Sequence, residues 1–544
     1  MKGRQTPGVV FQPQVHASLQ RGISKMVSAI RPTLGPLSGG VAMDHLNKTK
    51  SLPEFLDDGG VIARRMIELP NRDEDMGAML VRSMIVRQHE AIGDGTATVA
   101  VLFEAIFNAG LRYIAAGGNA MRLRRCLEGA VPLLLKSLDD MAFPLTGQQA
   151  VTGMAHSLCH DDEVAEVLGA AFDLLGAYGR LEIRDDYGRG VRHEDVAGNY
   201  FYSGLFSKTL VADDAPNGYT VVENPAIFLC DFDIEDHRTL FPVLQAAHAA
   251  SVRDLIIIAR TLSEKAIGLL ATNNRMGKFR TIAIQLPGLN PTDKMAAVED
   301  ISLMTGAVPF LQITGESLER VTAKQFGHAR RLWVDMNAFG LVGGRGDPRP
   351  LRHHLRRLKA RYHNSSKADE RKTLLARIGN LLGRSIIVRV GGFTETEIKA
   401  RKSLADRTAL ALRVAVEQGS VPGGGIALLN CRRLLEDHLS TVDDLDERAA
   451  YRILIKALAE PARTIFQNAG YDPGEVMAQL SERRADTGFD VVTRRVVNLC
   501  EAGILDSVIV LKTSLRNAIT TAAMTLTIDS LIHLARPEMI GNPQ

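Results

Sequence analysis

The stretch EAIGDGTATVAVL, residues 90–102, places one acidic residue and two threonines among glycines, between two apolar runs. Residues 99–107, downstream, are apolar on nearly every side, as in a buried helix. The upstream apolar residues recur at helical spacing, at Val81, Met84, Ile85 and Ile92. The segment between the two runs is therefore predicted to be a tight turn that leads into the N-terminus of a buried helix.

A turn of this composition suits a phosphate group. Gly93 and Gly95 allow the main chain to approach a ligand closely, and the first N–H groups of a helix lack partners at the positive end of its dipole. Asp94 then provides the carboxylate oxygen that a magnesium ion accompanying the phosphates prefers. The simpler interpretation, a helix capped by Thr96 after a glycine turn, remains open at this point.

Composition places the chain among soluble globular proteins. Its 544 residues are 45% hydrophobic and 23% charged, with a formal net charge of +3. This length predicts two or three domains, and the small net charge predicts no general affinity for nucleic acid or membranes. The N-terminus lacks an apolar signal core, and no uncharged stretch is long enough to span a bilayer. A cytoplasmic protein without disulfides is expected, because the five cysteines are dispersed, at positions 126, 159, 230, 431 and 500.

The pattern along the chain changes twice. Residues 1–140 are mainly helical in pattern, and a helical pattern returns from about residue 386, including the stretch from Leu515 to Leu534. Between them, short apolar runs alternate with helical segments, as at residues 226–229, 255–258 and 281–284. The simplest arrangement is a helical domain whose two halves flank an inserted α/β domain.

Two further clusters have an ordinary explanation beside a functional one. The basic run at residues 351–372 is typical of a nucleic-acid surface, but its leucines fall on one face, so an amphipathic helix with a solvated basic side is favoured. Helical spacing would also let four residues ligate a metal, although an ordinary helix start is the preferred interpretation. These four are His156, Cys159, His160 and Asp161.

A second glycine cluster lies at residues 423–425, within AVEQGSVPGGGIALL and just before an apolar helix. Three glycines in a row cost backbone entropy, and close approach of the main chain to a ligand would justify that cost. Residues 33–36, TLGP, and residues 93–98 provide two more such loops at helix starts. One nucleotide pocket would gather all three loops.

These segments resemble the group I chaperonins, the GroEL family. The resemblance runs in family order over nearly the whole chain, which is more specific than any single motif. It is carried by TLGPLSGGVAMD (33–44), DGGVIARRMIEL (58–69), MGAMLVRSM (76–84), GDGTATVAVL (93–102), LFPVLQAAHAASVRDLIIIA (240–259), GGFTETEIKARK (391–402), VEQGSVPGGGIALL (416–429) and EAGILDSV (501–508).

The resemblance implies a three-domain chaperonin fold of α and α/β type. An all-helical equatorial domain would comprise residues 1–140 and 418–544, and a small hinge-like intermediate domain residues 141–193 and 386–417. An α/β apical domain, residues 194–385, would bind non-native polypeptides and a co-chaperonin lid of the GroES type. Family members form homo-oligomers of seven-membered rings, stacked in pairs, and hydrolyse ATP with magnesium and potassium.

The resemblance also implies site residues. Asp94 matches the magnesium-binding acid, Asp58 an acid beside the attacking water, and Asp506 the acid that takes the ribose hydroxyls. The remaining positions expected to contact the nucleotide are Thr33, Leu34, Gly35, Pro36, Gly95, Thr96, Ala97, Thr98, Gly424, Asp490 and Val492. The apolar positions expected to grip clients are Phe201, Leu205, Phe206, Phe241, Leu244, Ile267 and Leu270. Without the resemblance, Phe241 and Leu244 would be assigned to the α/β core.

The chain departs from the family pattern where hydrolysis is concerned. A second catalytic acid is expected on the hinge helix, but the gapless segment 391–425 places Arg407 there, with Asp406 one residue earlier as the candidate acid. Asp57 replaces the family lysine before the DG pair, and Ala97 replaces a threonine. Losing a positioned base costs about 10²–10⁴ in rate. The alternatives are therefore a cycling chaperonin ATPase and a divergent paralogue that acts as a holdase or scaffold with little or no ATP hydrolysis.

Overall fold

The computed structural model describes residues 8–44, 53–211, 218–275, 279–365, 367–480 and 484–533. The chain divides into two compact units, residues 1–173 with 399–544, and residues 174–398. The predicted apical range 194–385 falls inside the second unit. The finer division into three domains stays a prediction.

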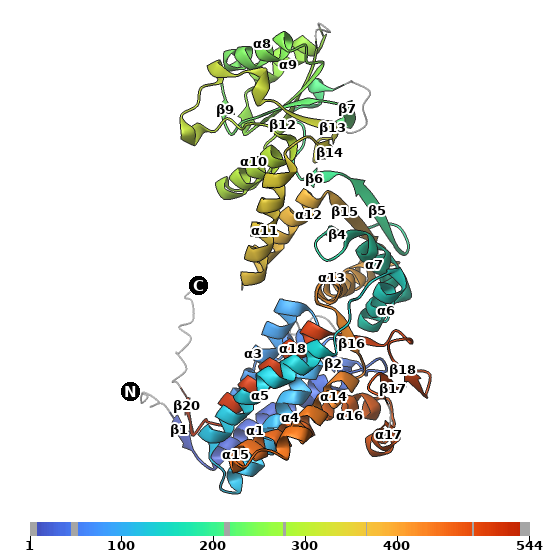
Figure 1. The fold of residues 1–544 in the computed structure, drawn as a ribbon. Coiled ribbons are helices and arrows are strands. Elements are labelled where there is room, and N and C mark those ends of the chain that lie inside the picture. The colour runs from blue at the N-terminus through green and yellow to red at the C-terminus, as the bar shows by residue number, and fades with distance from the viewer. Residues whose placement is uncertain are drawn as a thin grey trace. The chain divides into compact units, whose positions relative to one another are not determined.

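The first unit is mainly helical, as the sequence pattern of residues 1–140 and of the chain from about residue 386 predicts (Figure 1). Its helices are α1 (Gln14–Ile30), α2 (Gly59–Arg65), α3 (Arg72–Ile92), α4 (Thr96–Ala115), α5 (Ala120–Asp140), α6 (Gln148–Cys159), most of α7 (Asp162–Leu175) and of α13 (Glu395–Gln418), α14 (Ile426–Leu439), α15 (Leu445–Ala457), α16 (Glu460–Asn468), α17 (Pro473–Leu480) and α18 (Val508–Thr525). The predicted helix at residues 515–534 is too long, because β20 begins at Ser530; Leu534 lies outside the described residues.

The same unit also contains two-stranded antiparallel pairs, which the all-helical expectation omitted. These pairs are β1 (Gly8–Phe11) with β20 (Ser530–His533), β2 (Val41–Met43) with β3 (Glu54–Leu56), β16 (Ser420–Pro422) with β19 (Leu505–Ser507), and β17 (Thr487–Asp490) with β18 (Arg495–Asn498). The β16–β19 pair joins segments far apart in the sequence. It therefore fixes the glycine cluster beside Asp506.

Close helix packing explains two glycines of the first unit. A Cβ at Gly22 of α1 would lie 1.7 Å from the carbonyl oxygen of Glu74, and a Cβ at Gly77 of α3 would lie 2.5 Å from that of Leu19. Helices α1 and α3 therefore touch backbone to backbone. Helix α4 is long and apolar enough to cross a bilayer, but Phe103 and Phe107 are fully buried, and the helix belongs to the core.

The second unit contains the predicted α/β module (Figure 1). Its larger sheet has the order β12-β10-β8-β13-β14-β6, with β7 also paired to β13, and the smaller sheet has the order β4-β15-β5. The strands are β4 (Arg180–Asp185), β5 (Val191–Ala197), β6 (Asn199–Phe201), β7 (Thr220–Glu223), β8 (Ala226–Leu229), β10 (Asp254–Ala259), β12 (Arg280–Gln285), β13 (Gly327–Val334), β14 (Phe339–Gly344) and β15 (Arg384–Val390); β9 (Asp233–Ile234) pairs with β11 (Thr261–Leu262).

Strands β8, β10 and β12 are parallel and buried on both faces, which explains their continuous apolar sequences. Residues such as Ile256 and Ile258 pack toward helices α10 (Pro291–Thr305), α11 (Pro348–Asn364) and α12 (Ala368–Leu382). The alternate residues, such as Ile257, pack toward α8 (Phe241–Ala249) and α9 (Glu264–Arg275). The predicted amphipathic helix in the basic run is confirmed, although the run is divided between α11 and α12.

Candidate functional site

The predicted turn at residues 93–96 is confirmed. Gly93 and Gly95 both adopt left-handed conformations, with φ of 81° and 77°, and Gly95 is the N-cap of α4. A Cβ on Gly95 would lie 2.6 Å from Val510 Cγ1 and 2.7 Å from Ser514 Oγ. The simpler interpretation of a helix capped by Thr96 is wrong, because Thr96 is already inside the helix. Thr96 and Ala97 are buried, whereas Thr98 is half-buried.

Asp94 lies at the centre of an acidic cluster. Burial raises the pKa of its carboxyl, and the charge of Asp58 raises it further. Burial likewise raises the pKa of Asp506 to about 7, with the charge of Asp94 as the next cause. The charge of Asp58 thus disfavours ionisation of Asp94, and the charge of Asp94 disfavours ionisation of Asp506, although the three acids come from distant parts of the sequence. A divalent cation bound at Asp94 would relieve this repulsion, so the donor set fits magnesium.

The loop at residues 33–36 is held by α16. Asn468 Nδ2 donates to the carbonyl oxygens of both Arg31 and Leu34 at 2.9 Å. Gly35 has φ of 100°, and a Cβ there would lie 3.2 Å from Ile465 of α16. Thr33 and Leu34 are half-buried, whereas Pro36 is exposed. The loop therefore has a fixed backbone at the end of α1.

The second glycine cluster lies beside Asp506. Asp506 pairs with Val421 in the β16–β19 ladder, and its carboxylate accepts a hydrogen bond from the main chain of Gly425. Gly424 has φ of 65°, and nothing lies within 4 Å of the position where its Cβ would be. Gly425 is the N-cap of α14 and approaches the backbone of Ala462. Open space beside Gly424 is what a ligand would need.

Asp490 and Val492 lie at the β17–β18 hairpin, where they have a local structural role. The Asp490 carboxylate accepts from the Val492 N–H at 2.9 Å and from the Thr493 hydroxyl at 2.5 Å. Val492 is exposed, whereas the neighbouring Val491 packs against Phe466 of α16. Helix α16 thus contacts both this hairpin and the loop at residues 33–36. The contact of Asp490 and Val492 with the adenine base of a nucleotide stays a prediction.

Arg407, not Asp406, faces the other candidate catalytic acid. Arg407 Nη1 lies 2.8 Å from Asp58 Oδ2, and Arg407 Nη2 lies 3.8 Å from Asp57 Oδ2. The Asp58 side chain is largely buried and also caps α2, because Oδ1 accepts from the Val61 N–H at 2.7 Å. Asp406 is exposed on α13, one residue or about 100° around the helix from Arg407. The ion pair therefore neutralises Asp58 where a second acid was expected.

His89 of α3 is a neighbour of Asp58 that the sequence did not reveal. Its Nδ1 lies 3.6 Å from Asp58 Oδ1, and this buried nitrogen has no hydrogen-bond partner among the described residues. Burial lowers the pKa of His89, outweighing the opposing charge of Asp58. The imidazole is therefore neutral near pH 7. No sequence signal distinguishes this residue from an ordinary core histidine.

Two other groups of residues with metal-like spacing, one predicted from the sequence and one seen only in the structure, have structural explanations. His156 Nε2 lies 2.7 Å from Asp162 Oδ1, and helix α7 begins at Asp162, as the ordinary interpretation predicts. In the second unit, His354 meets Glu299 and Asp300 in a cluster that has metal-like spacing. Arg377 Nη2 lies 2.7 Å from Asp300 Oδ1, so a guanidinium already neutralises this cluster.

The raised pKa of Asp506 predicts a pH-dependent stability. Because its folded pKa of about 7 exceeds the ordinary value of 3.8 for an aspartate, the fold disfavours the ionised form, and stability falls as pH rises between these values. In the nucleotide-free protein, Asp506→Asn is therefore expected to raise the melting temperature relative to wild type, by an amount that grows from pH 4 to pH 7 and then stays constant. Differential scanning fluorimetry across pH measures this. A pH-independent difference would contradict it.

The apolar residues predicted to grip clients differ in exposure. Phe201, Leu205 and Leu270 are buried in the core of the second unit, with Phe201 stacked on Phe339. Phe206, Leu244 and Ile267 are half-buried, and Phe241 is 43% exposed. The more accessible members of the set thus include Phe241 and Leu244 of α8 and Ile267 of α9. Their contact with a client stays a prediction.

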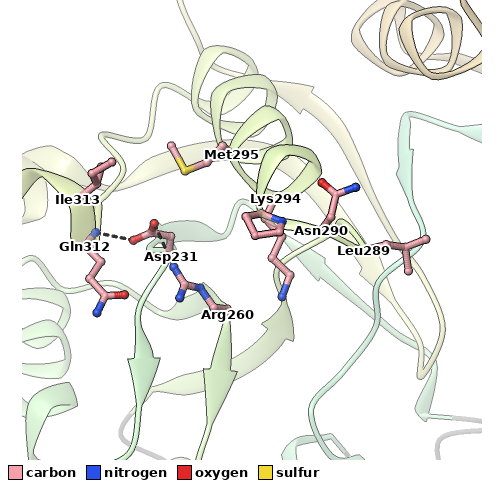
Figure 2. A pocket seen from close by; sticks show the side chains of 9 residues that line it. Asp231, Arg260, Leu289, Asn290, Lys294, Met295, Gln312 and Ile313 are labelled. Atoms are coloured by element: carbon pink, nitrogen blue, oxygen red, sulfur yellow. Dashed lines mark hydrogen bonds and ion pairs between the residues drawn. The ribbon is translucent and has the colours of Figure 1, made fainter. Parts of the chain in front are cut away.

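A pocket that the sequence did not reveal lies beyond the carboxyl ends of β8 and β10 (Figure 2). Its volume is about 460 Å³. Asp231 stabilises its wall by accepting from the Gln312 N–H at 2.6 Å and pairing with Arg260 at 3.3 Å. Leu289 and Ile313 flank it with 99% and 85% of their surface exposed. Isolated apolar residues in turns resemble core positions, which is why sequence patterns missed them.

Comparison with known proteins assigns the chain to a family. Residues 26–536 match the TCP-1/cpn60 chaperonin family. The chain is also similar to the chaperonin gp146 from the bacteriophage EL 2 (Pseudomonas aeruginosa), crystallised in the presence of ATP-BeFx in two forms. These matches have TM-scores of 0.67 and 0.61 at 19% and 20% identity, and each covers 97% of this chain and 99% of the phage chain. The chain belongs to the TCP-1/cpn60 chaperonin family.

Proposed function

We propose that this chaperonin couples ATP binding to the capture and enclosure of non-native polypeptides. The observation that carries the proposal is the convergence of Asp58, Asp94 and Asp506 with the glycine turns at residues 93–95 and 423–425. The effect of Asp58 on Asp94, the effect of Asp94 on Asp506, and the hydrogen bond between Asp506 and Gly425 join segments from opposite ends of the sequence. Such a cradle suits a triphosphate and its magnesium ion.

Each part of the cradle has a proposed role. The N–H groups at the start of α4, with the hydroxyls of Thr96 and Thr98, bind phosphate oxygens, and the loop at residues 33–36 closes the other side. Asp94 holds magnesium, which supplies charge neutralisation to the phosphates, and Asp506 accepts hydrogen bonds from ribose hydroxyls. Gly424, Asp490 and Val492 are proposed to contact the rest of the nucleotide, and potassium is the expected second cation.

Hydrolysis depends on how the Asp58–Arg407 pair responds to nucleotide. We propose that Asp58 orients the attacking water and that Arg407 contributes positive charge beside the phosphates, without acting as a base. In the nucleotide-free chain each side chain neutralises the other. This ion pair is also the observation that favours the alternative, a holdase or scaffold that binds ATP but hardly hydrolyses it.

The proposed assembly follows the resemblance. We propose seven-membered rings stacked in pairs, a lid of the GroES type, and a cytoplasmic location. Clients are proposed to bind exposed apolar surface, because hydrophobic surface is what unfolded chains share. Phe241 with Leu244 and Ile267, and the newly found Leu289 and Ile313, offer such surface on the second unit.

Client binding provides the functional test. The assembled protein is expected to suppress aggregation of a chemically unfolded protein and to release it on addition of ATP, as light scattering and refolding yield would report. The double variant Leu289→Ser/Ile313→Ser is expected to suppress aggregation less well while keeping its stability, because both side chains are almost fully exposed. Ile67→Ser/Leu445→Ser removes exposed apolar residues elsewhere and is the control.

Two outcomes would contradict parts of this proposal. Suppression of client aggregation without release of the client on addition of ATP would favour the holdase. If the Leu289→Ser/Ile313→Ser variant suppressed aggregation as well as wild type, these residues would not belong to the client surface. An assembly that neither binds clients nor responds to ATP would contradict the proposed cycle as a whole.

A further inference from the structure

Helix α11 has an unusual charge composition. Its sequence PRPLRHHLRRLKARYHN, residues 348–364, contains five arginines and one lysine and no carboxylate. One side of this helix is built into the unit, because Leu358 and Tyr362 are buried in the core shared with the sheet and with α12. His354 is also buried on this side, with Nε2 3.0 Å from Asp300 Oδ1. The remaining cations must therefore lie on the other sides.

Three of these cations have partners within the unit. Arg357 lies 3.8 Å from Glu299, and Arg361 lies 3.2 Å from Glu370. Lys359 lies over the ring of Tyr178, with Nζ 3.9 Å from the centroid. Each cation along this edge of the helix therefore has a partner within the unit.

The other three arginines form a separate row together with His353. Arg349, Arg352, His353 and Arg356 are all exposed and have the spacing i, i+3, i+4, i+7, which places them on one helical face. Within the described part of the chain, none of the four forms an ion pair; Arg352 Nε donates only to the carbonyl oxygen of Pro348, at 3.2 Å. We use the term cationic stripe for these four residues.

The cationic stripe is unfavourable for the helix that carries it. Like charges at i, i+3 and i, i+4 repel each other on a helix surface. Arg349 also lies in the first turn, where the helix dipole is positive and disfavours a cation. A bound polyanion would relieve both effects. The ion-paired edge of the same helix shows that this unit supplies carboxylate partners elsewhere along α11. Beside the stripe, the Asp347 carboxylate caps the helix by accepting from the Arg349 N–H at 2.9 Å, and among the described residues it forms no ion pair with the stripe.

We propose that the cationic stripe binds acidic segments of polypeptides. This proposal extends the proposed client binding by an electrostatic class of partner, and it requires neither nucleotide nor the apolar surface at Leu289 and Ile313. The helix rises about 10 Å over the stripe, which three or four residues of an extended peptide would span. Acidic residues along such a peptide would meet the guanidinium groups of Arg349, Arg352 and Arg356.

Nucleic acid is the less favoured polyanion. Single-stranded nucleic acids are usually bound by exposed aromatic side chains on which bases stack, beside basic residues. The aromatic side chain of α11, Tyr362, is buried at 3% exposure, and Lys359 lies over the ring of Tyr178. The stripe therefore offers charge without a stacking surface. A polypeptide carboxylate needs only the charge and the hydrogen-bond donors.

The test uses the full assembled protein and a fluorescent, unstructured glutamate-rich peptide. Wild type is expected to bind the peptide, with an affinity that falls as salt increases. Arg349→Gln/Arg352→Gln/Arg356→Gln is expected to lower the affinity about tenfold, the effect of three surface ion pairs of ordinary strength. The control Arg320→Gln/Lys324→Gln/Arg330→Gln removes the same charge from exposed positions of the same unit and is expected to change the affinity little.

Several results would overturn the proposal. If the stripe variant and the control variant lost affinity for the peptide equally, the effect would come from net charge alone. An affinity of wild type that does not depend on salt would exclude an electrostatic site, whether or not the variants fold. If an oligothymidylate bound more tightly than the peptide and lost its affinity in the stripe variant, the partner would be nucleic acid. Persistence of peptide binding in Leu289→Ser/Ile313→Ser would separate the stripe from the apolar surface.

Discussion

The Asp58→Asn protein is expected to release phosphate from bound ATP about 10²–10⁴ times more slowly than wild type in a single turnover, the usual effect of removing a positioned base. Asparagine keeps the N-cap of α2, because its side-chain oxygen can still accept from the Val61 N–H. The loss should therefore appear in the chemical step, with the fold and ATP affinity largely retained. Rapid-quench measurement with radiolabelled ATP separates these quantities.

Glu90→Gln is the matched control for Asp58→Asn. Glu90 is an exposed acid on α3 that pairs with Arg64, so its replacement makes the same change in charge without touching the Asp58–Arg407 pair. Its turnover should equal that of wild type. Equal phosphate release by the Asp58→Asn protein and wild type, both well above background, would contradict the role of Asp58. Release at background by wild type itself would favour the holdase.

The double variant Asp57→Lys/Arg407→Asp is expected to hydrolyse ATP about a hundredfold faster than wild type, because it adds an acid on the hinge helix. The single variant Arg407→Asp should not show this gain. It would place a new carboxylate near Asp57 and Asp58 and remove the guanidinium that now pairs with them. Repulsion among these acids is expected to lower the melting temperature and the affinity for ATP.

Steady-state phosphate release and scanning fluorimetry of the two single variants and the double variant form a double-mutant cycle. Strong coupling between positions 57 and 407 in both measurements is the expected result. Independent, additive effects would show that Arg407 does not act through this acidic cluster. A double variant that folds, binds ATP and turns over no faster than wild type would show that the missing acid does not limit the rate.

The sequence predicted the backbone of the candidate site better than its side-chain contacts. The turn at residues 93–96 was predictable because a left-handed conformation and close packing both require glycine, and the apolar periodicity on either side sets its place. The parallel strands β8, β10 and β12 were predictable for a similar reason, since burial on both faces selects continuous apolar runs. Both signals are local in the sequence.

The contacts that distinguish this chain are not local. The Asp58–Arg407 pair joins residues 349 positions apart. The resemblance placed Arg407 at the position of the expected acid, but no local pattern shows that its guanidinium pairs with Asp58. The burial of Phe201, Leu205 and Leu270 likewise depends on how distant strands and helices pack. The exposure of Leu289 and Ile313 could not be predicted from the sequence either, because an apolar residue in a turn is as compatible with a core as with a surface.

Titration calorimetry of the intact assembly with ATP and magnesium tests the central claim most directly, that separated segments form one nucleotide cradle. The expected result is saturable binding of ATP with one site per chain. The Asp94→Asn protein should bind ATP more weakly, because it loses the part of the affinity that depends on magnesium. Nucleotide binding that is indifferent to magnesium would contradict the role of Asp94. The absence of any heat of ATP binding by the properly assembled protein would contradict the cradle itself.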